Sequence, residues 1–280
     1  MSMASRGQSE VLTAVILVSA IMALAAVFLV ISMRSFNSES SYYSITYVAS
    51  FLSNVADDID TYMMMPGTQL TYALPNTEYG VYNFVNTGDA HCTVSVALSG
   101  QTIITEESGV LIYGVPPSYY SMPSGFMYVW RGSNLTGFPT VNPRDLSTVV
   151  VPKSFAPTGT VVSLVQLGYG EINGLTYGSS LVMIPRVIAM NGTSNGGVGY
   201  VYIPVFTELS TPSVGRGTLI VKVISVSSSS VNNPTGELKV VETCSIGGYA
   251  IPQGRADNAT VTGGTVYIVT IEIGFGLGGS

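Results

Sequence analysis

The side chains best suited to chemistry are few, and their spacing does not fit a catalytic or metal site. Asp57, Asp58 and Asp60 form the densest acidic group, and carboxylate oxygens suit Ca²⁺, but they lack the spacing of an EF-hand loop. Asp57 and Asp60 are three residues apart, which makes them neighbours on one helical turn. We interpret the group as a solvated helix face, with a cation site as the alternative.

The single histidine, His91, leaves only one candidate base for a Ser/His/Asp triad. A nucleophile pair with Cys92 is disfavoured because adjacent strand residues point to opposite faces. The stretch GYGEING, residues 168–174, lacks both GxGxxG spacing and the Lys-Ser/Thr of a phosphate-binding loop. We therefore expect a turn histidine, a loop between strands, no catalytic residue, no metal, no cofactor and a protein that is not an enzyme.

The amino-acid composition also limits which classes of molecule the protein is expected to bind. Of 280 residues, 46% are hydrophobic and only 9% are charged, against roughly 25% charged in an average soluble domain. The net charge is −6, and no basic cluster is available to contact a phosphate backbone. We expect no nucleic acid partner, and a protein whose solubility does not rest on surface charge.

The two cysteines, Cys92 and Cys244, are distant in sequence, and neither has the spacing of a metal site. They form either a structural disulfide in an exported domain or two unpaired buried thiols. A disulfide would close a loop of about 150 residues and stabilise the fold by roughly 4–5 kcal/mol through chain entropy.

An apolar run from Val11 to Met33 contains no charged residue. As a helix it would cross the roughly 30 Å hydrocarbon core of a bilayer at 1.5 Å per residue. A secretory signal peptide has a shorter apolar core of about 7–15 residues, so a membrane anchor fits better.

A second helical pattern follows this run. Ser35–Ser44, rich in Ser and Asn, is the weakest part and a candidate bend, and Pro66 is the first breaker, so one helix should extend from about Gln8 to Met65. Apolar residues spaced by three and four positions form one stripe, which we expect to pack on the rest of the chain. The stripe consists of Ile45, Val48, Leu52, Val55, Ile59 and Tyr62.

From residue 67 onward the period changes to two, and Gly, Pro, Asn and Ser separate the apolar runs. This predicts about ten antiparallel strands in a sandwich of immunoglobulin or jelly-roll type, as one domain or two lobes, and an α+β fold overall. Some runs are apolar on both faces, which predicts cover on both sides. The predicted strands are Cys92–Leu98, Gly109–Val115, Gly125–Trp130, Thr148–Pro152, Thr160–Leu167, Leu181–Ile188, Gly199–Phe206, Thr218–Ser225, Glu237–Cys244 and Tyr267–Ile273.

Three sequons, at Asn134, Asn191 and Asn258, have turn-like surroundings and are candidate glycosylation sites. Glycans there would supply hydration that the sparse charges do not. Among the 17 tyrosines, Tyr42 and Tyr43 stand where the helix leaves its apolar half, and we interpret them as interface residues.

The stretch RG followed by QSEVLTAVILVSAIMALAAVFLVI resembles the N-terminus of archaeal type IV pilin-like proteins, which carry a class III signal peptide. The resemblance covers about the first 60 residues. It implies a leader, residues 1–7, that a prepilin peptidase recognises at Arg6 and Gly7 and removes before Gln8. Glu10 would then be the third mature residue, whereas many pilins place the acid fifth.

The resemblance further implies a helix over residues 8–66, an extracellular β domain over residues 67–280, and a pilus assembly machinery as partner. The precursor would sit in the cytoplasmic membrane, and the mature chain would polymerise with itself into an open helical adhesion filament on the cell surface. A carboxylate in an apolar core needs a partner, so Glu10 is expected to pair with the Gln8 amine of an adjacent copy; the alternative is a residue at the membrane interface. The helix residues expected to drive assembly are Glu10, Val11, Leu12, Val15, Ile16, Ile21, Leu24, Phe28 and Ile31.

Three alternatives remain open. The chain could be a monomeric, membrane-anchored receptor or carbohydrate-binding ectodomain with the same span but no polymer. It could be an anchored hydrolase, or a minor pilin that primes a filament of other subunits.

Overall fold

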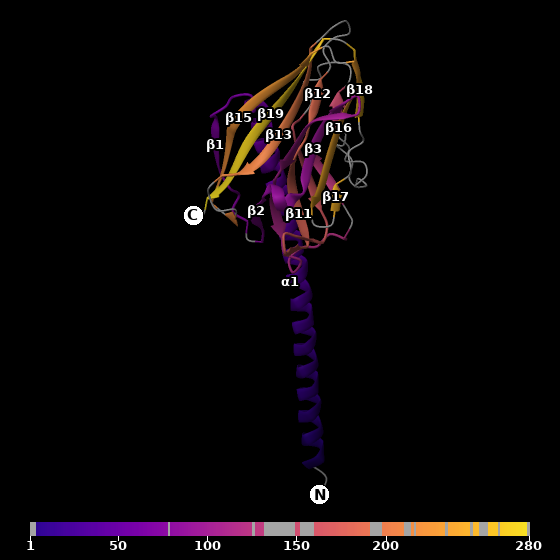
Figure 1. The fold of residues 1–280 in the computed structure, drawn as a ribbon. Helices are drawn as coiled ribbons and strands as arrows, with labels where there is room; N and C mark the ends of the chain where they lie inside the picture. Colours follow the sequence, from indigo (N-terminus) through magenta and orange to yellow (C-terminus); the bar gives the residue numbers. More distant parts are fainter. Residues whose placement is uncertain are drawn as a thin grey trace.

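One long helix leads into a β domain, so that the N-terminus and the β domain lie at opposite ends of the molecule (Figure 1). Helix α1 (Ala4–Tyr62) has 59 residues and is therefore about 90 Å long. The computed structural model describes residues 4–77, 79–124, 127–131, 149–151, 160–190, 198–209, 214–215, 217–232, 235–246, 249–251, 257–262 and 264–278.

Helix α1 departs from the sequence prediction at two points. The predicted bend at residues 35–44 is absent, because this segment is helical throughout, and the Ser44 hydroxyl donates to the Ser40 carbonyl at 3.0 Å. The helix also ends at Tyr62 rather than Met65. There the Met65 amide donates to the Tyr62 carbonyl at 2.9 Å in a tighter turn, and Pro66 prevents continuation.

The β domain contains three main sheets and a small hairpin. Sheet A has the order β1 (Gln69–Ala73), β15 (Thr218–Asn232), β19 (Thr265–Gly278), β13 (Val198–Glu208), β12 (Ile188–Met190) and β7 (Val149–Val151). Sheet B has the order β14 (Val214–Gly215), β2 (Val81–Val85), β5 (Val110–Val115), β11 (Ser179–Pro185), β8 (Val162–Leu167) and β6 (Met127–Arg131). Sheet C has the order β17 (Tyr249–Ile251), β16 (Thr235–Ile246), β3 (Cys92–Leu98) and β4 (Gln101–Ser108), with β18 (Asp257–Thr262) also paired to β16.

The predicted α+β fold with a sandwich-like, mostly antiparallel β domain is confirmed, but two details differ. The described residues contain nineteen strands rather than about ten, and β13 pairs in parallel with β19, as β12 does with β7. The predicted strand Leu181–Ile188 is in fact two strands, because the chain leaves sheet B after Pro185 and enters sheet A at Ile188. Alternation within a run cannot show such a change of sheet.

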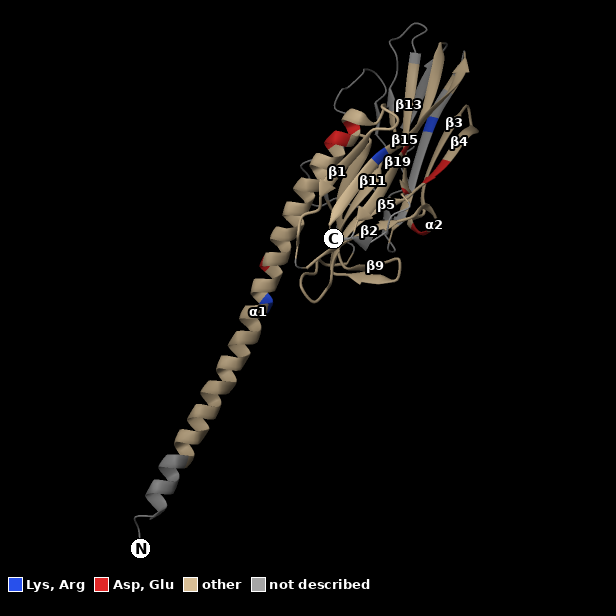
Figure 2. Ribbon diagram, turned by 90° about the vertical axis from the view of Figure 1, so that its left-hand side faces the viewer, with Lys and Arg blue, Asp and Glu red and all other residues tan. Residues whose placement is uncertain are grey.

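The second half of α1 lies in the largest core, against sheets A and B. Sheet A contributes the side of β19 that carries Ile271 and Phe275, and sheet B contributes the side of β11 that carries Leu181 and Met183. Figure 2 shows the helix running beside the strands of the β domain. The second half of the helix therefore covers one side of the domain and packs on apolar faces of sheets A and B.

Sheet C covers the other faces of sheets A and B. Cys92 and Ile246 pack with Val182 of sheet B, while Val94 and Val96 pack with Val201 and Ile268 of sheet A, among others. Every residue of β11 is buried, as predicted for a run that is apolar on both faces, because α1 lies on one side of this strand and sheet C on the other.

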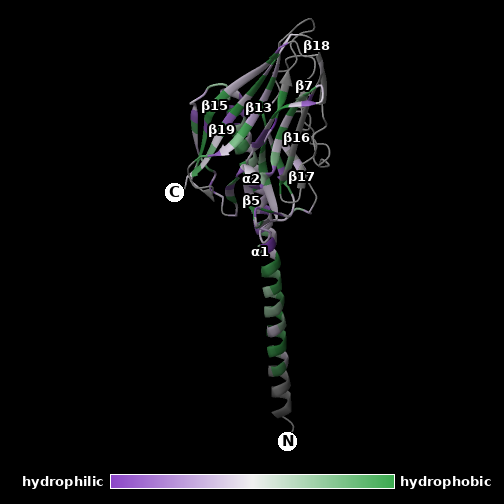
Figure 3. Ribbon diagram, viewed as in Figure 1, coloured by the Kyte–Doolittle hydropathy of each residue, from purple (hydrophilic) through white to green (hydrophobic). Residues whose placement is uncertain are grey.

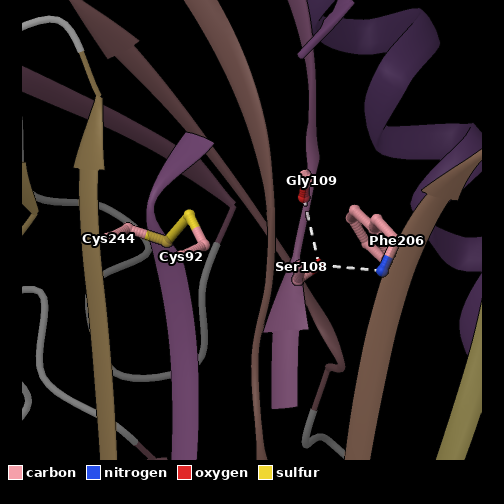
Figure 4. Close-up of a disulfide and its surroundings, with 5 residues drawn as sticks. All are labelled: Cys92, Ser108, Gly109, Phe206 and Cys244. Atoms are coloured by element: carbon pink, nitrogen blue, oxygen red, sulfur yellow. Dashed lines mark hydrogen bonds between the residues drawn. A yellow bond between two sulfur atoms is a disulfide. The ribbon is translucent and has the colours of Figure 1, made fainter. Parts of the chain in front are cut away.

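The three sheets meet where β4 of sheet C passes into β5 of sheet B. The Ser108 hydroxyl accepts from the Phe206 amide of sheet A at 2.8 Å (Figure 4). The Gly109 amide donates to the Phe206 carbonyl at 2.8 Å. The Ser108 hydroxyl also donates to the Gly109 carbonyl at 3.1 Å. One serine thus fixes the crossing point between the sheets.

Beside this crossing, Cys92 and Cys244 form a disulfide (Figure 4). They occupy directly opposite positions on the antiparallel strands β3 and β16, with Cα atoms 4.0 Å apart. The alternative of two unpaired thiols is thereby excluded.

Replacing both Cys92 and Cys244 with alanine should lower the free energy of unfolding by about 4–5 kcal/mol. The unfolded chain would regain the freedom lost in closing a loop across a sequence separation of 152 residues. Denaturant unfolding of the full chain in detergent micelles measures this change. Reduced wild-type protein should match the variant, and an unchanged midpoint in both would contradict the prediction.

Candidate functional site

In the described part of the chain, the first half of α1 carries a long run of exposed apolar side chains. We call residues Leu12–Phe36 the stalk. Every stalk residue is exposed, with Leu24 at 71% and Phe28 at 72% of full exposure. Figure 3 shows an apolar column along the helix, followed by a hydrophilic segment next to the β domain. The predicted assembly residues Leu12, Val15, Ile16, Ile21, Leu24, Phe28 and Ile31 are all exposed on it.

The stalk is suited to apolar surroundings. It is long and apolar enough to cross a membrane by length and composition, with none of its most apolar window buried. The Ser19 hydroxyl donates to the Val15 carbonyl at 2.7 Å, so this polar group needs no outside partner. An exposed apolar surface of this size marks contact with lipid or with other proteins.

The residues predicted for processing lie at the start of α1. The backbone is helical from Ala4, so Arg6, Gly7, Gln8 and Glu10 all lie within the helix. Their side chains, and that of Val11, are outside the described part of the structure. The pairing of Glu10 therefore remains a prediction.

The second half of α1 meets the β domain through the expected stripe. Five of its residues are 0–2% exposed in the main core: Ile45, Val48, Leu52, Val55 and Ile59. Tyr62 was predicted as a sixth, but it is only half-buried and lies outside this core, at the last residue of the helix. Ala49 and Ala56 were not predicted; they are fully buried and widen the stripe.

The prediction of a solvated face holds for Asp57, whose side chain is 64% exposed, but Asp58 and Asp60 are half-buried, and all three aspartates have partners in the β domain. Arg131 of β6 donates from Nη1 to Asp57 Oδ1 and from Nη2 to Asp60 Oδ2, each at 2.6 Å. Asp60 also accepts the Val161 amide at 2.8 Å. Because Arg131 is 71 or more residues away in sequence, no local pattern could have identified it.

Asp58 forms a further bond, accepting the hydroxyl proton of Tyr72 of β1 at 2.8 Å. All three aspartates therefore bind the β domain, two of them to sheet B and one to sheet A. We call Asp57, Asp58, Asp60, Tyr72 and Arg131 the clasp. No group of metal-binding side chains occurs in the described part of the chain, so the cation site gains no support.

Burial raises the pKa of the Asp60 carboxyl above its ordinary value. The Val161 amide, the Thr160 hydroxyl and the Arg131 guanidinium act in the opposite direction and offset only part of this effect. The folded protein thus holds this proton to a higher pH than the unfolded chain. The resulting contribution to stability is complete below the ordinary pKa and is lost as the pH rises through the raised pKa.

Aromatic side chains gather where the stalk reaches the β domain. The Tyr42 ring lies 6.2 Å from both Tyr43 and Tyr120, which follows β5, and Tyr79 lies 4.8 Å from Tyr119. Tyr42 and Tyr43 remain exposed on the helix, as does Tyr47 one turn further on. This tyrosine collar adds exposed aromatic side chains at the base of the β domain, separated from the apolar run of the stalk by the polar segment of residues 37–41.

His91 and the GYGEING stretch, the other candidates for chemistry, lie in a helix cap and a β-hairpin. His91 is exposed and caps the short helix α2 (Thr87–Ala90) in the left-handed conformation, with φ of 46°. The GYGEING stretch is only partly the predicted loop between strands, because it contains strand β9 (Gly170–Ile172). Its Asn173 and Gly174, with φ of 50° and 73°, form the turn of the hairpin with β10 (Leu175–Tyr177).

Of the three sequons, Asn134 and Asn191 lie outside the described residues. Asn258 lies in β18, opposite Lys239 of β16, so the expected turn-like setting is wrong for this site. A residue in a strand can still face solvent, and its glycosylation stays a prediction.

Comparison with known proteins finds no matching family model, curated protein or solved structure. We therefore infer the function from the structure of this chain.

Arg131→Met should lower the free energy of unfolding by about 1–3 kcal/mol, because it leaves the half-buried Asp60 without its guanidinium partner. Asp57→Asn is the matched control, since it removes an exposed partner of the same guanidinium and should cost less than about 1 kcal/mol. The deficit of Arg131→Met should grow as the pH rises through the pKa of Asp60. Thermal unfolding at several pH values tests this, and equal effects of both variants would contradict it.

Proposed function

We propose that this protein is the structural subunit of an extracellular filament of the type IV pilus kind, used in adhesion. The observation that carries the proposal is the division of one unbroken helix. Its second half packs into the main core of the β domain, whereas the stalk is exposed at every residue and is apolar around the helix from Leu12 to Met33.

The stalk needs an apolar environment before and after assembly. In the precursor the lipid of the cytoplasmic membrane would supply it. In a filament, the stalks of many copies would pack together and exclude water, while the β domains form the outer layer. Contact between two different surfaces of the same chain does not close on itself, so repetition of this contact gives an open polymer.

Two further features favour assembly over a simple anchor. A single span needs about 20 residues, yet α1 continues rigidly into the domain without a flexible linker, which fixes the direction of the stalk relative to the domain. The tyrosine collar also places exposed aromatic side chains beyond the length that a membrane core would cover, and tyrosine is favoured at protein interfaces. A prepilin peptidase and an assembly machinery are the partners that this function requires.

A membrane-anchored monomeric receptor is the second candidate, because one apolar helix followed by an exported β domain also suits that role. In an anchored receptor the stalk contacts only lipid, whereas in a filament it packs against other helices. Lipid tolerates a change of apolar side-chain shape, whereas packing between helices does not.

Leu24→Ala should reduce filament yield and leave the stability of the β domain unchanged, because Leu24 is 71% exposed in the subunit. Leu52→Ala is the matched control on the same helix. Leu52 is fully buried, so its truncation should cost about 2–5 kcal/mol of domain stability. The measurements are filament mass sheared from cells and thermal unfolding of unassembled protein. Normal filament yield from Leu24→Ala and from Phe28→Ala would favour the anchored receptor.

Glu10→Gln should lower filament yield about tenfold, because the amide keeps the shape of the side chain but removes the charge that would pair with the amine of a neighbouring Gln8. Membrane insertion of the precursor should be unchanged. Filament counts by electron microscopy and membrane fractionation give the two readouts. Normal filaments from this variant and from Glu10→Ala would exclude a role for Glu10 in setting the register.

A further inference from the structure

A ladder of tyrosine rings lies on one face of sheet A. Tyr200 of β13 pairs in register with Tyr267 of β19, and Tyr202 follows two residues along β13, so all three side chains share a face. The Tyr200 and Tyr267 ring centroids are 5.4 Å apart with 19° between their planes. Tyr200 and Tyr202 are 6.0 Å apart with 12° between theirs.

This part of the face is partly exposed to solvent. Nearer the stalk, the same face is covered by α1, but the helix ends at Tyr62, and the loop after it contacts β15 at Val223. Strands β13 and β15 continue beyond the end of the helix (Figure 2). Tyr200 and Tyr267 are 37% and 36% exposed.

Uncharged polar groups flank the ladder. Ser230 lies opposite Tyr267, and Ser228 lies opposite the next residue on the same face; both serines are exposed. At the end of the strands, the Thr265 hydroxyl is within 3.2 Å of the Asn232 side-chain oxygen. Hydroxyl and amide groups thus line one side of the three rings.

Charged side chains on the three strands avoid this region. Lys222 of β15 and Glu272 of β19 alternate to the opposite face of the sheet. Glu208 of β13 lies at the other end of the strand, eight residues from Tyr200 and about 26 Å away by strand rise. An ionic ligand would find no counter-charge among these strands.

We propose that this face, formed by Tyr200, Tyr202, Tyr267, Ser228 and Ser230, binds a neutral oligosaccharide. Sugar rings have flat faces of C–H groups that contact aromatic rings, and a rim of hydroxyls that exchange hydrogen bonds with serine and amide side chains. Both types of group are present here side by side, and a neutral sugar needs no charged partner. A neutral oligosaccharide would then be the ligand to which the filament adheres. This biological role rests on the proposed function.

The test uses the full chain, unassembled, in a detergent without a sugar headgroup. Hexamers of β-1,4-linked glucose, N-acetylglucosamine and mannose are the neutral probes, with a galacturonate hexamer as the acidic control, in calorimetric titration. At least one neutral hexamer should bind, and the acidic hexamer should bind at least about tenfold more weakly. Tyr200→Ala combined with Tyr267→Ala should weaken the neutral ligand at least about tenfold, whereas the double phenylalanine variant, which keeps the rings, should stay within about threefold.

Tyr119→Ala is the matched control, because Tyr119 is also exposed and also contacts another tyrosine ring. It should leave binding unchanged, and thermal unfolding should show that every variant is folded. Failure of all neutral hexamers, equal binding by the double alanine variant, or stronger binding of the acidic hexamer would overturn the proposal. Since the chain is unassembled, these outcomes are independent of filament formation, which the Leu24 variants test separately.

Discussion

One unbroken helix has to satisfy two different environments, and the rest of the structure depends on this constraint. Over its second half, α1 supplies the central side chains of the main core, between faces of sheets A and B. The stalk residues Leu12–Phe36 are all exposed and lie outside the hydrophobic cores of the described part of the chain. A rigid helix transmits the position of one half to the other, so whatever covers the stalk also fixes the orientation of the β domain.

The β domain is correspondingly incomplete without the helix. Sheets A and B turn their apolar faces toward Leu52 and its neighbours on the stripe, and removal of the helix would expose those faces to water. The clasp then fixes the end of the helix at Asp57, Asp58 and Asp60, where the apolar stripe runs out. Hydrophobic packing provides most of the attachment of helix α1 to the β domain. The polar bonds of the clasp fix the C-terminal end of the helix.

The sequence allowed prediction of features that depend on local periodicity. The stalk, the stripe from Ile45 to Ile59 and the main strands could be predicted, because apolar spacing distinguishes helices from strands. Features that depend on distant pairing could not. Nothing near Asp60 indicates Arg131, nothing between Leu181 and Ile188 indicates a change of sheet, and the ladder of Tyr200 and Tyr267 exists only through the parallel register of β13 and β19.

The central claim is that the stalk leaves the membrane and enters a filament after processing. Mass spectrometry of the N-terminal peptide, on protein sheared from intact cells and on the membrane fraction of the same cells, tests it most directly. We predict that the sheared protein begins at Gln8, with the precursor confined to the membrane. Protein that begins at Met1 and is found only in the membrane would contradict the claim and identify the chain as an anchored surface protein.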